Sequence, residues 1–194
     1  MPSATTETTR DRIIDAAEEC FARFGVAKTT VEDIAAAANL SRATVYRSVT
    51  GGRDELIMEV VLRDLRRFLD HLADRLRNER SVAEAVVEGT LDAIAYVRER
   101  PATAAFLLPE TAGHMQAAVA RGVEHVLKVC CDYVRPHFEA AQRHRVLRAD
   151  IDVEGTVEFL FRVITSMIVM DRDREPAAQR RWLRTYVVPV IAGP

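Results

Sequence analysis

The stretch TTVEDIAAAANLSRATVYR, residues 29–47, decides the fold of this 194-residue chain. It carries two helix N-caps only eleven residues apart, Thr30 before Val-Glu-Asp and Ser41 before Arg-Ala-Thr. A capping hydroxyl accepts a hydrogen bond from a backbone N–H in the first helical turn, and a carboxylate three residues on returns one. The spacing therefore predicts two short helices, at about residues 31–38 and 42–48.

The residues in and between these helices suit a helix-turn-helix. Ala35 is small where the two helices must approach closely, and Ile34, Leu40 and Val45 are apolar where both must face one core. Asn39 falls in the tight turn, where a left-handed backbone is needed and Asn is the best substitute for Gly. On spacing alone, an ordinary helical hairpin is an equally good interpretation.

Composition narrows the classes of function. The chain is 48% hydrophobic and 29% charged, which is typical of a globular protein. Its 27 basic and 29 acidic side chains leave a net charge of -2, so the whole chain does not attract polyanions. Any contact with nucleic acid must be local, and residues 39–53 offer three Arg and no acid.

No uncharged stretch is longer than ten residues, whereas a helix that crosses a bilayer needs about 20 apolar residues. The N-terminus lacks the apolar segment of a signal peptide, so we expect a cytoplasmic protein. Cys20, Cys130 and Cys131 are an odd number with two adjacent members, and we expect reduced thiols.

Apolar residues recur at spacings of three and four through most of the chain, which predicts an all-α fold. Pro136 is expected to bend one helix. Residues 186–191 are rich in β-branched side chains and could form a strand, but Pro189 and the lack of a partner strand argue against it. Beyond the two short helices, we expect helices at residues 9–24, 53–77, 81–100, 115–142 and 153–170 and from Pro176 onward.

Residues 29–47, followed by Gly-Arg-Asp-Glu-Leu at 52–56, closely resemble the DNA-binding domain of the TetR family of transcriptional regulators. The resemblance covers roughly residues 10–60 and is densest in the run Ser-Arg-Ala-Thr-Val-Tyr. It implies a homodimeric repressor, without a cofactor, whose third helix lies in the major groove of a palindromic operator. It also implies a DNA-binding domain over 1–56 and a helical ligand-binding and dimerisation domain over 57–194, with about nine helices in all.

Within that resemblance, Arg42 can offer a bidentate fork to a guanine, and the methyl groups of Ala43 and Thr44 can meet a thymine methyl. Tyr46 and Arg47 suit contacts to the DNA backbone. The remaining candidates stand at helix N-termini, where free N–H groups favour a phosphate. These are Lys28, Thr29, Thr30 and Arg53, although for Thr30 a plain helix cap serves equally well.

Two positions depart from the family pattern. After Tyr46 the family usually shows two aromatic or His residues and then Phe, but here Arg47, Ser48 and Val49 follow. We expect Val49 to pack less tightly between the third and fourth helices, and Ser48 to give a weaker phosphate contact.

Residues 159–170 contain nine apolar side chains in twelve, too many for one stripe facing its own core. The second apolar face of this helix is most simply covered by an identical subunit. The alternative is that the helix lies at the centre of a monomeric bundle. The expected dimer residues are Phe159, Val163, Met167, Trp182, Tyr186 and Val190.

The middle of the chain mixes apolar bulk with a few polar groups, as small-molecule sites do. A cavity for a hydrophobic effector is expected there, as in the family, although most of these residues also suit a plain core. The candidates are Tyr96, Phe106, His114, Met115, Cys130 and Tyr133.

Three other classes of function are alternatives to a DNA-binding regulator. An enzyme has little support, because the chain has no His-Glu-x-x-His pattern, no Gly-rich phosphate loop and no nucleophile elbow. A metal or redox sensor could use Cys130 and Cys131 with His125 or His137, but Cys-x-x-Cys spacing is absent and no metal is expected. The third is a helical scaffold that binds only protein.

Overall fold

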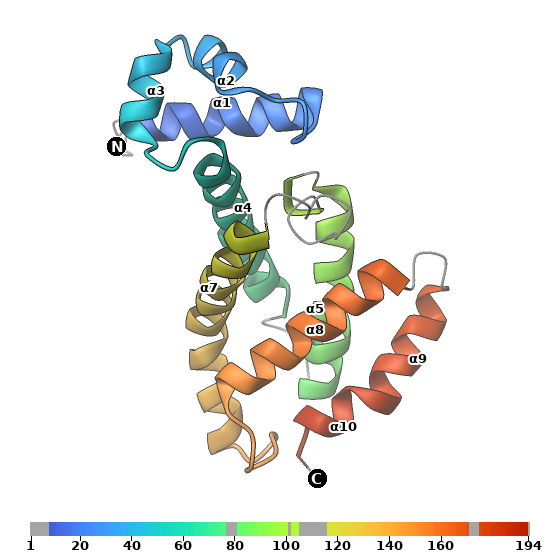
Figure 1. The fold of residues 1–194 in the computed structure, drawn as a ribbon. Helices are drawn as coiled ribbons and strands as arrows, with labels where there is room; N and C mark the ends of the chain where they lie inside the picture. The colour runs from blue at the N-terminus through green and yellow to red at the C-terminus, as the bar shows by residue number, and fades with distance from the viewer. Residues whose placement is uncertain (1–7, 77–80, 101, 105–115, 171–174, 194) are drawn as a thin grey trace, which may run out of the picture. The chain divides into compact units, whose positions relative to one another are not determined.

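The computed structural model describes residues 8–76, 81–100, 102–104, 116–170 and 175–193, with the backbone alone for 116–121. All regular secondary structure in these ranges is helical, which confirms the all-α prediction (Figure 1). The helices are α1 (Thr9–Phe24), α2 (Val31–Ala37), α3 (Arg42–Ser48), α4 (Gly52–Leu76), α5 (Val82–Glu99), α7 (Gln116–Arg143), α8 (Val153–Met170), α9 (Pro176–Tyr186) and α10 (Val188–Ile191).

The chain forms two compact units. The first comprises residues 1–64 and 100–119, and the second comprises residues 65–99 and 120–194. The expected boundary after residue 56 falls inside α4, and the division into domains 1–56 and 57–194 stays a prediction.

α1 in the first unit is delimited by its caps. The Asp11 N–H donates to Thr8 Oγ1 at 3.1 Å, and the Thr8 N–H donates to Asp11 Oδ2 at 3.0 Å. At the other end Gly25 adopts φ 80°, a conformation that glycine tolerates best. The spacing of Ile13, Ala17, Phe21 and Phe24 predicts one apolar stripe on this helix. The first three are buried, whereas Phe24 is 43% exposed at the end of α1.

The turn between α2 and α3 is built around Asn39, whose φ of 53° is left-handed as the sequence predicted. The Leu40 N–H donates to the Ala35 carbonyl at 2.9 Å, and the Asn39 N–H donates to the Ala36 carbonyl at 3.1 Å. These are the two hydrogen bonds of a Schellman motif, which ends α2 and redirects the chain into α3.

Both predicted caps of this helix pair are present. Thr30 and Asp33 form a reciprocal capping box at the start of α2, and Ser41 Oγ accepts from the Thr44 N–H at 3.1 Å at the start of α3. Ile34 and Val45 are 0% and 1% exposed. The helix-turn-helix is therefore anchored by buried apolar side chains from both helices, which are Val31, Ile34 and Ala35 of α2 and Val45 of α3.

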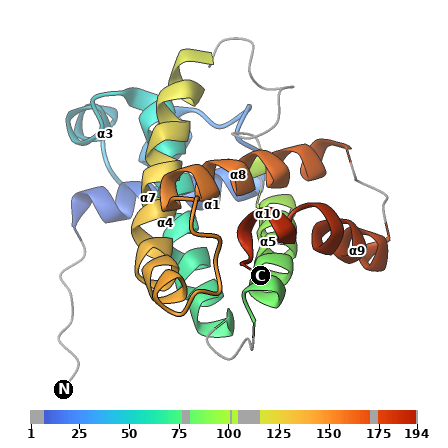
Figure 2. The same cartoon turned by 90° about the horizontal axis from the view of Figure 1, so that it is seen from below.

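In the second unit, α5 packs against α8 and α9, and α10 contacts both α5 and α9 (Figures 1 and 2). Val87 of α5, Leu183 of α9 and Ile191 of α10 are buried in this unit. α5 thus lies at the centre of the second unit's packing.

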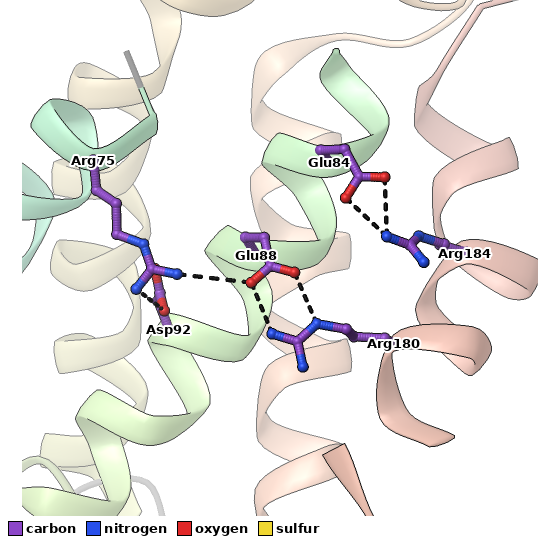
Figure 3. A network of polar contacts seen from close by, with 6 residues as sticks. All are labelled: Arg75, Glu84, Glu88, Asp92, Arg180 and Arg184. Atoms are coloured by element: carbon purple, nitrogen blue, oxygen red, sulfur yellow. Dashed lines mark hydrogen bonds and ion pairs between the residues drawn. The ribbon is translucent and has the colours of Figure 1, made fainter. Parts of the chain in front are cut away.

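An ion-pair network, called the Glu88 network below, joins α5 to α4 and α9 within the second unit (Figure 3). Glu88 accepts two hydrogen bonds from Arg180, both at 2.9 Å, and lies 3.7 Å from Arg75. Arg75 is also 2.7 Å from Asp92. One turn before Glu88, Glu84 pairs with Arg184 at 2.9 Å and completes the network.

Prolines explain where the helices differ from the prediction. The last helix begins at Pro176 as expected but is interrupted at Val187, because Pro189 has no N–H to donate to the preceding turn. The strand alternative for residues 186–191 is wrong, since α10 occupies most of that segment. α7 stays helical through Pro136, and the bend expected there stays a prediction.

Candidate nucleic-acid interface

α3 turns one face to the core and the other to solvent. Val45 is 1% exposed, whereas Arg42, Ala43, Tyr46 and Arg47 are exposed. Arg42 and Tyr46 are four positions apart, as are Ala43 and Arg47, and residues at this spacing lie above one another on a helix. The exposed face therefore presents two guanidinium groups, a phenol and a methyl group together, which suits insertion into the major groove.

Thr44 is half-buried and takes part in capping α3. Its hydroxyl lies 2.9 Å from Ser41 Oγ, and Arg47 Nη2 lies 3.4 Å from the same Thr44 hydroxyl. The cap orders the first turn, so Arg42 and Ala43 project from a fixed helix start.

Arg42 is held on two sides. Its Nη1 lies 2.6 Å from Oε1 of Glu32 in the first turn of α2, and its guanidinium carbon lies 5.8 Å from the centroid of the Tyr46 ring. A hydrogen bond with Tyr46 and the charge of Glu32 raise the pKa of Arg42. The side chain is thus a permanent cation, ordered by a carboxylate and an aromatic ring.

The start of α2 carries two of the predicted phosphate contacts. Lys28 is exposed, while the Thr30 hydroxyl is used in the capping box with Asp33. Hydrogen bonds from Thr30 lower the pKa of Asp33, so this carboxylate is ionised at neutral pH. Thr30 therefore serves as the helix cap that was its alternative interpretation.

The prediction that Thr29 contacts DNA needs correction. The residue is 2% exposed, and its hydroxyl donates to the carbonyls of Cys20, at 3.1 Å, and Gly25, at 2.9 Å. A buried hydroxyl that bonds the end of α1 cannot reach a phosphate without unfolding that turn. Thr29 fixes the α1–α2 turn instead.

Arg53, the predicted phosphate contact at the start of α4, is also engaged inside the first unit. Its Nε donates to the Thr29 carbonyl at 3.0 Å, and its Nη2 donates to the Val26 carbonyl. The guanidinium thereby joins the start of α4 to the α1–α2 turn. A contact between Arg53 and a phosphate stays a prediction.

Arg10 was not singled out from the sequence, yet it organises the end of α3. Its Nη1 donates to the Ser48 carbonyl at 2.7 Å, and its Nη2 donates to Glu55 at 2.9 Å and to Glu59 at 2.8 Å. These partners lie 38 to 49 residues away in the sequence, so no local pattern could have revealed them.

Arg63 and Arg12 play similar parts. Arg63 of α4 pairs with Asp15 and Glu18 of α1, and Arg12 of α1 donates to the Ala38 carbonyl at 2.7 Å. Several basic side chains of the first unit therefore hold its helices together rather than face outward.

Val49, one of the two departures from the family pattern, is 1% exposed. It is therefore buried, while its looser packing stays a prediction. Glu55 accepts from the Gly51 N–H at 2.6 Å and fixes the turn that follows, where Gly52 adopts φ 63°. Ser48 is half-buried, and its carbonyl is the group bonded by Arg10.

Three of the six predicted effector residues can be placed. Tyr96 of α5 stacks on Phe68 of α4 with ring centroids 4.4 Å apart. Cys130 and Tyr133 are half-buried on α7, and a hydrogen bond to Asp70 raises the pKa of Tyr133. Phe106, His114 and Met115 lie outside the described residues, so the effector site stays a prediction.

The expected dimer residues divide into two groups. Tyr186 and Val190 are 62% and 40% exposed, and Trp182, with its ring centroid 5.6 Å from that of Tyr186, is half-buried. Phe159 and Val163 of α8 are also half-buried. These five side chains therefore remain candidates for an interface.

Met167 is a correction to that set, because it is 3% exposed and belongs to the core of its own protomer. α8 packs on α5 in the same unit. Met170, 78% exposed, is the methionine of α8 that reaches solvent.

The cysteines do not resemble metal or redox ligands. Burial raises the pKa of Cys130 to about 12 and also raises the pKa of Cys131, so both thiols are protonated at neutral pH and are weak ligands and nucleophiles. Among the described residues, no three His, Cys, Asp or Glu side chains gather in a cluster suited to a metal. In the same part of the chain, no helix is long and apolar enough to cross a membrane.

Comparison with known proteins identifies the same segment. The family model described as bacterial regulatory proteins, tetR family, matches residues 13–57, from α1 into the start of α4. The chain is 27% identical over 194 residues to the HTH-type transcriptional regulator Rv1255c of Mycobacterium tuberculosis, covering 98% of this chain and 89% of that regulator.

Two solved structures share the fold over nearly the whole chain. GusR of Salmonella enterica has a TM-score of 0.69 at 23% identity and covers 98% of this chain and 99% of its own. RolR in complex with resorcinol has a TM-score of 0.69 at 19% identity and covers 89% of this chain and 86% of its own.

Proposed function

Because the chain belongs to the TetR family of bacterial transcriptional regulators, we propose that it is a homodimeric repressor. α3 of each protomer reads one half-site of a palindromic operator in the major groove. A small hydrophobic effector, bound by the helices that follow α4, releases the DNA by favouring the conformer that cannot span both half-sites.

The observation that carries this proposal is the exposed face of α3. Arg42 supplies a bidentate fork for a guanine, and Ala43 supplies a methyl group beside it. Tyr46 and Arg47, one turn further on, suit the DNA backbone. The residues proposed to contact bases therefore come first along α3, and those proposed to contact the DNA backbone follow one turn later.

A palindrome requires two readers, and the second unit offers a surface for pairing them. Exposed Tyr186 and Val190 and half-buried Trp182 form an aromatic and aliphatic strip along α9 and α10, and half-buried Phe159 and Val163 lie on α8. Aromatic residues are enriched at the buried centres of protein interfaces. A two-fold pairing through this surface gives each operator half-site its own α3.

The effector proposal rests on the mixed aromatic and polar residues Tyr96, Cys130 and Tyr133. RolR, which shares the fold, binds resorcinol in its solved structure. A ligand of comparable size and aromatic character is the class we propose for this chain. A regulator of this kind works in the cytoplasm on double-stranded DNA and needs no catalytic residue.

Selection from a randomised DNA library with the full-length protein tests the proposal. We expect enrichment of a palindrome, bound by two protomers. Lys28 and Arg47 are the exposed cations among the predicted phosphate contacts, which gives about four phosphate contacts per dimer and a slope of log K against log salt of about -3.6. Affinity should then fall about 150-fold between 50 and 200 mM salt.

Two variants separate reading from positioning on the duplex. Arg42→Ala should relax preference at one base pair per half-site, while Arg47→Ala should weaken all sequences alike and make the salt slope shallower by about 2 per dimer. Failure to enrich any sequence, or identical effects of the two variants, contradicts the proposed function.

A further inference from the structure

Glu32 lies beside the proposed base-reading side chain and has no assigned role. It stands in the first turn of α2, and its Oε1 is 2.6 Å from Arg42 Nη1 across the helix-turn-helix. Both side chains remain largely in solvent, with 60% of Arg42 and 48% of Glu32 exposed. An acid at a surface meant for DNA is unexpected, because it repels phosphates.

The geometry leaves Arg42 able to read a base while it is paired. A guanidinium has five N–H donors in a rigid fork. Glu32 engages the Nη1 side, and the Tyr46 ring lies 5.8 Å from the guanidinium carbon, within the range of a cation–π contact. Tyr46 also takes a hydrogen bond from the guanidinium, and the donors that remain form the edge that can bind O6 and N7 of a guanine.

We propose that Glu32 is a positioning residue, which together with Tyr46 orders the Arg42 side chain so that its free edge reads a guanine. This inference rests on the proposed function. A long side chain that is ordered before binding loses less conformational entropy in the complex. The paired Arg42 is also less available to arbitrary phosphates, which strengthens discrimination.

The alternative is that Glu32 merely competes with DNA for Arg42. In that case, breaking the ion pair frees the guanidinium to bind DNA. Affinity for the operator then rises at least as much as affinity for non-specific DNA. The ratio of specific to non-specific affinity then stays constant or rises when Glu32 is neutralised. Positioning predicts the opposite sign, so one substitution distinguishes the two ideas.

The test uses Glu32→Gln in the full-length protein, with an operator selected by the wild type and a panel of single base-pair changes. Arg42→Ala first identifies the base pair that depends on Arg42. At that base pair we expect Glu32→Gln to lower discrimination about 2- to 10-fold, the range for ordering one long side chain. Preferences at the other positions should stay the same, and affinity for non-specific DNA should rise.

Two controls define the result. Asp54→Asn removes an acid from the first turn of α4 that is exposed and forms no ion pair among the described residues. It changes the net charge equally but should leave discrimination at the Arg42 position intact. In the Arg42→Ala background, Glu32→Gln should have no further effect on base preference, and thermal melting should show that each variant is folded.

Each outcome decides the question. Constant or higher discrimination in Glu32→Gln overturns the positioning role, as does an equal loss in Asp54→Asn. If Arg42→Ala changes no base preference, Arg42 does not read a base, and the proposed positioning role of Glu32 is overturned as well. If the wild type enriches no sequence at all, the proposed function itself is overturned.

Discussion

Replacing Glu88 by Gln should destabilise the second unit by an amount that depends on pH. Glu88 is 18% exposed and Arg180 is 40% exposed, and the two hydrogen bonds between them are both 2.9 Å long. A hydrogen bond to a charged group contributes about 1.5 to 3 kcal/mol. Partial exposure of Arg180 reduces this, so we expect a loss of about 1 to 2 kcal/mol, or 3 to 6 °C in Tm for a protein of this size.

The pH dependence follows from the direction of the pKa shift. Hydrogen bonding to Arg180 lowers the pKa of Glu88 in the folded protein. The stabilisation is therefore complete above the ordinary pKa of a Glu and disappears as the pH falls through the lowered value. The contribution of Asp92 in the same network to stability changes with pH in the opposite direction. Burial raises its pKa, so this contribution grows as the pH falls toward the ordinary pKa of an Asp.

Urea unfolding of the wild type and Glu88→Gln between pH 7 and pH 3.5 measures this. The two free energies of unfolding should differ at pH 7 and converge in acid. Glu84→Gln is the matched control, since Glu84 and Arg184 are 40% and 50% exposed and should contribute about 1 kcal/mol or less. A difference that is constant with pH, or an equal loss in Glu84→Gln, would refute this reasoning.

Three further predictions concern the first unit. Thr29→Val should lower stability by about 1 kcal/mol, because two carbonyls lose a buried donor, and a loss of DNA affinity without any change in thermal melting would instead restore Thr29 as a DNA contact. Arg10→Lys keeps the charge but loses the guanidinium that joins the Ser48 carbonyl to two carboxylates. Because α3 is then less ordered, operator affinity measured by titration should fall about 5-fold. Unchanged affinity would show that other contacts hold α3. Asn39→Ala removes the short polar side chain that lets Asn tolerate the left-handed region, so it should cost about 1 kcal/mol in denaturant unfolding. Asn39→Gly should be close to neutral, and an equal loss in both variants would contradict the backbone argument.

Local chemistry made much of the fold predictable. The caps at Thr30 and Ser41 and the turn at Asn39 depend on hydrogen bonds between residues three to five positions apart, so the sequence contains all the partners. α3 matches its predicted residues 42–48, and α1 matches 9–24. Pro189 shows the limit of periodicity, because the apolar stripe continues across it while the helix does not.

The roles of individual polar side chains were harder to predict, because they depend on contacts between distant segments. Thr29 and Thr30 are adjacent in sequence and chemically identical, yet one is buried against α1 and the other caps α2. Met167 and Met170 are one helical turn apart, yet one is 3% and the other 78% exposed. Only the tertiary packing around α8 separates these two methionines.

Charge around α3 shows most clearly what the sequence could not reveal. Residues 39–53 contain three Arg and no acid, which predicts a basic patch, but in space Glu32 from α2 lies beside Arg42. Of the three Arg side chains, Arg53 donates to backbone carbonyls inside the first unit. It therefore has fewer donors left for DNA. The basic surface left for DNA is therefore smaller and more ordered than a count of charges indicates. A reader with few free cations has little non-specific affinity, and its selectivity must come from how accurately Arg42 is held.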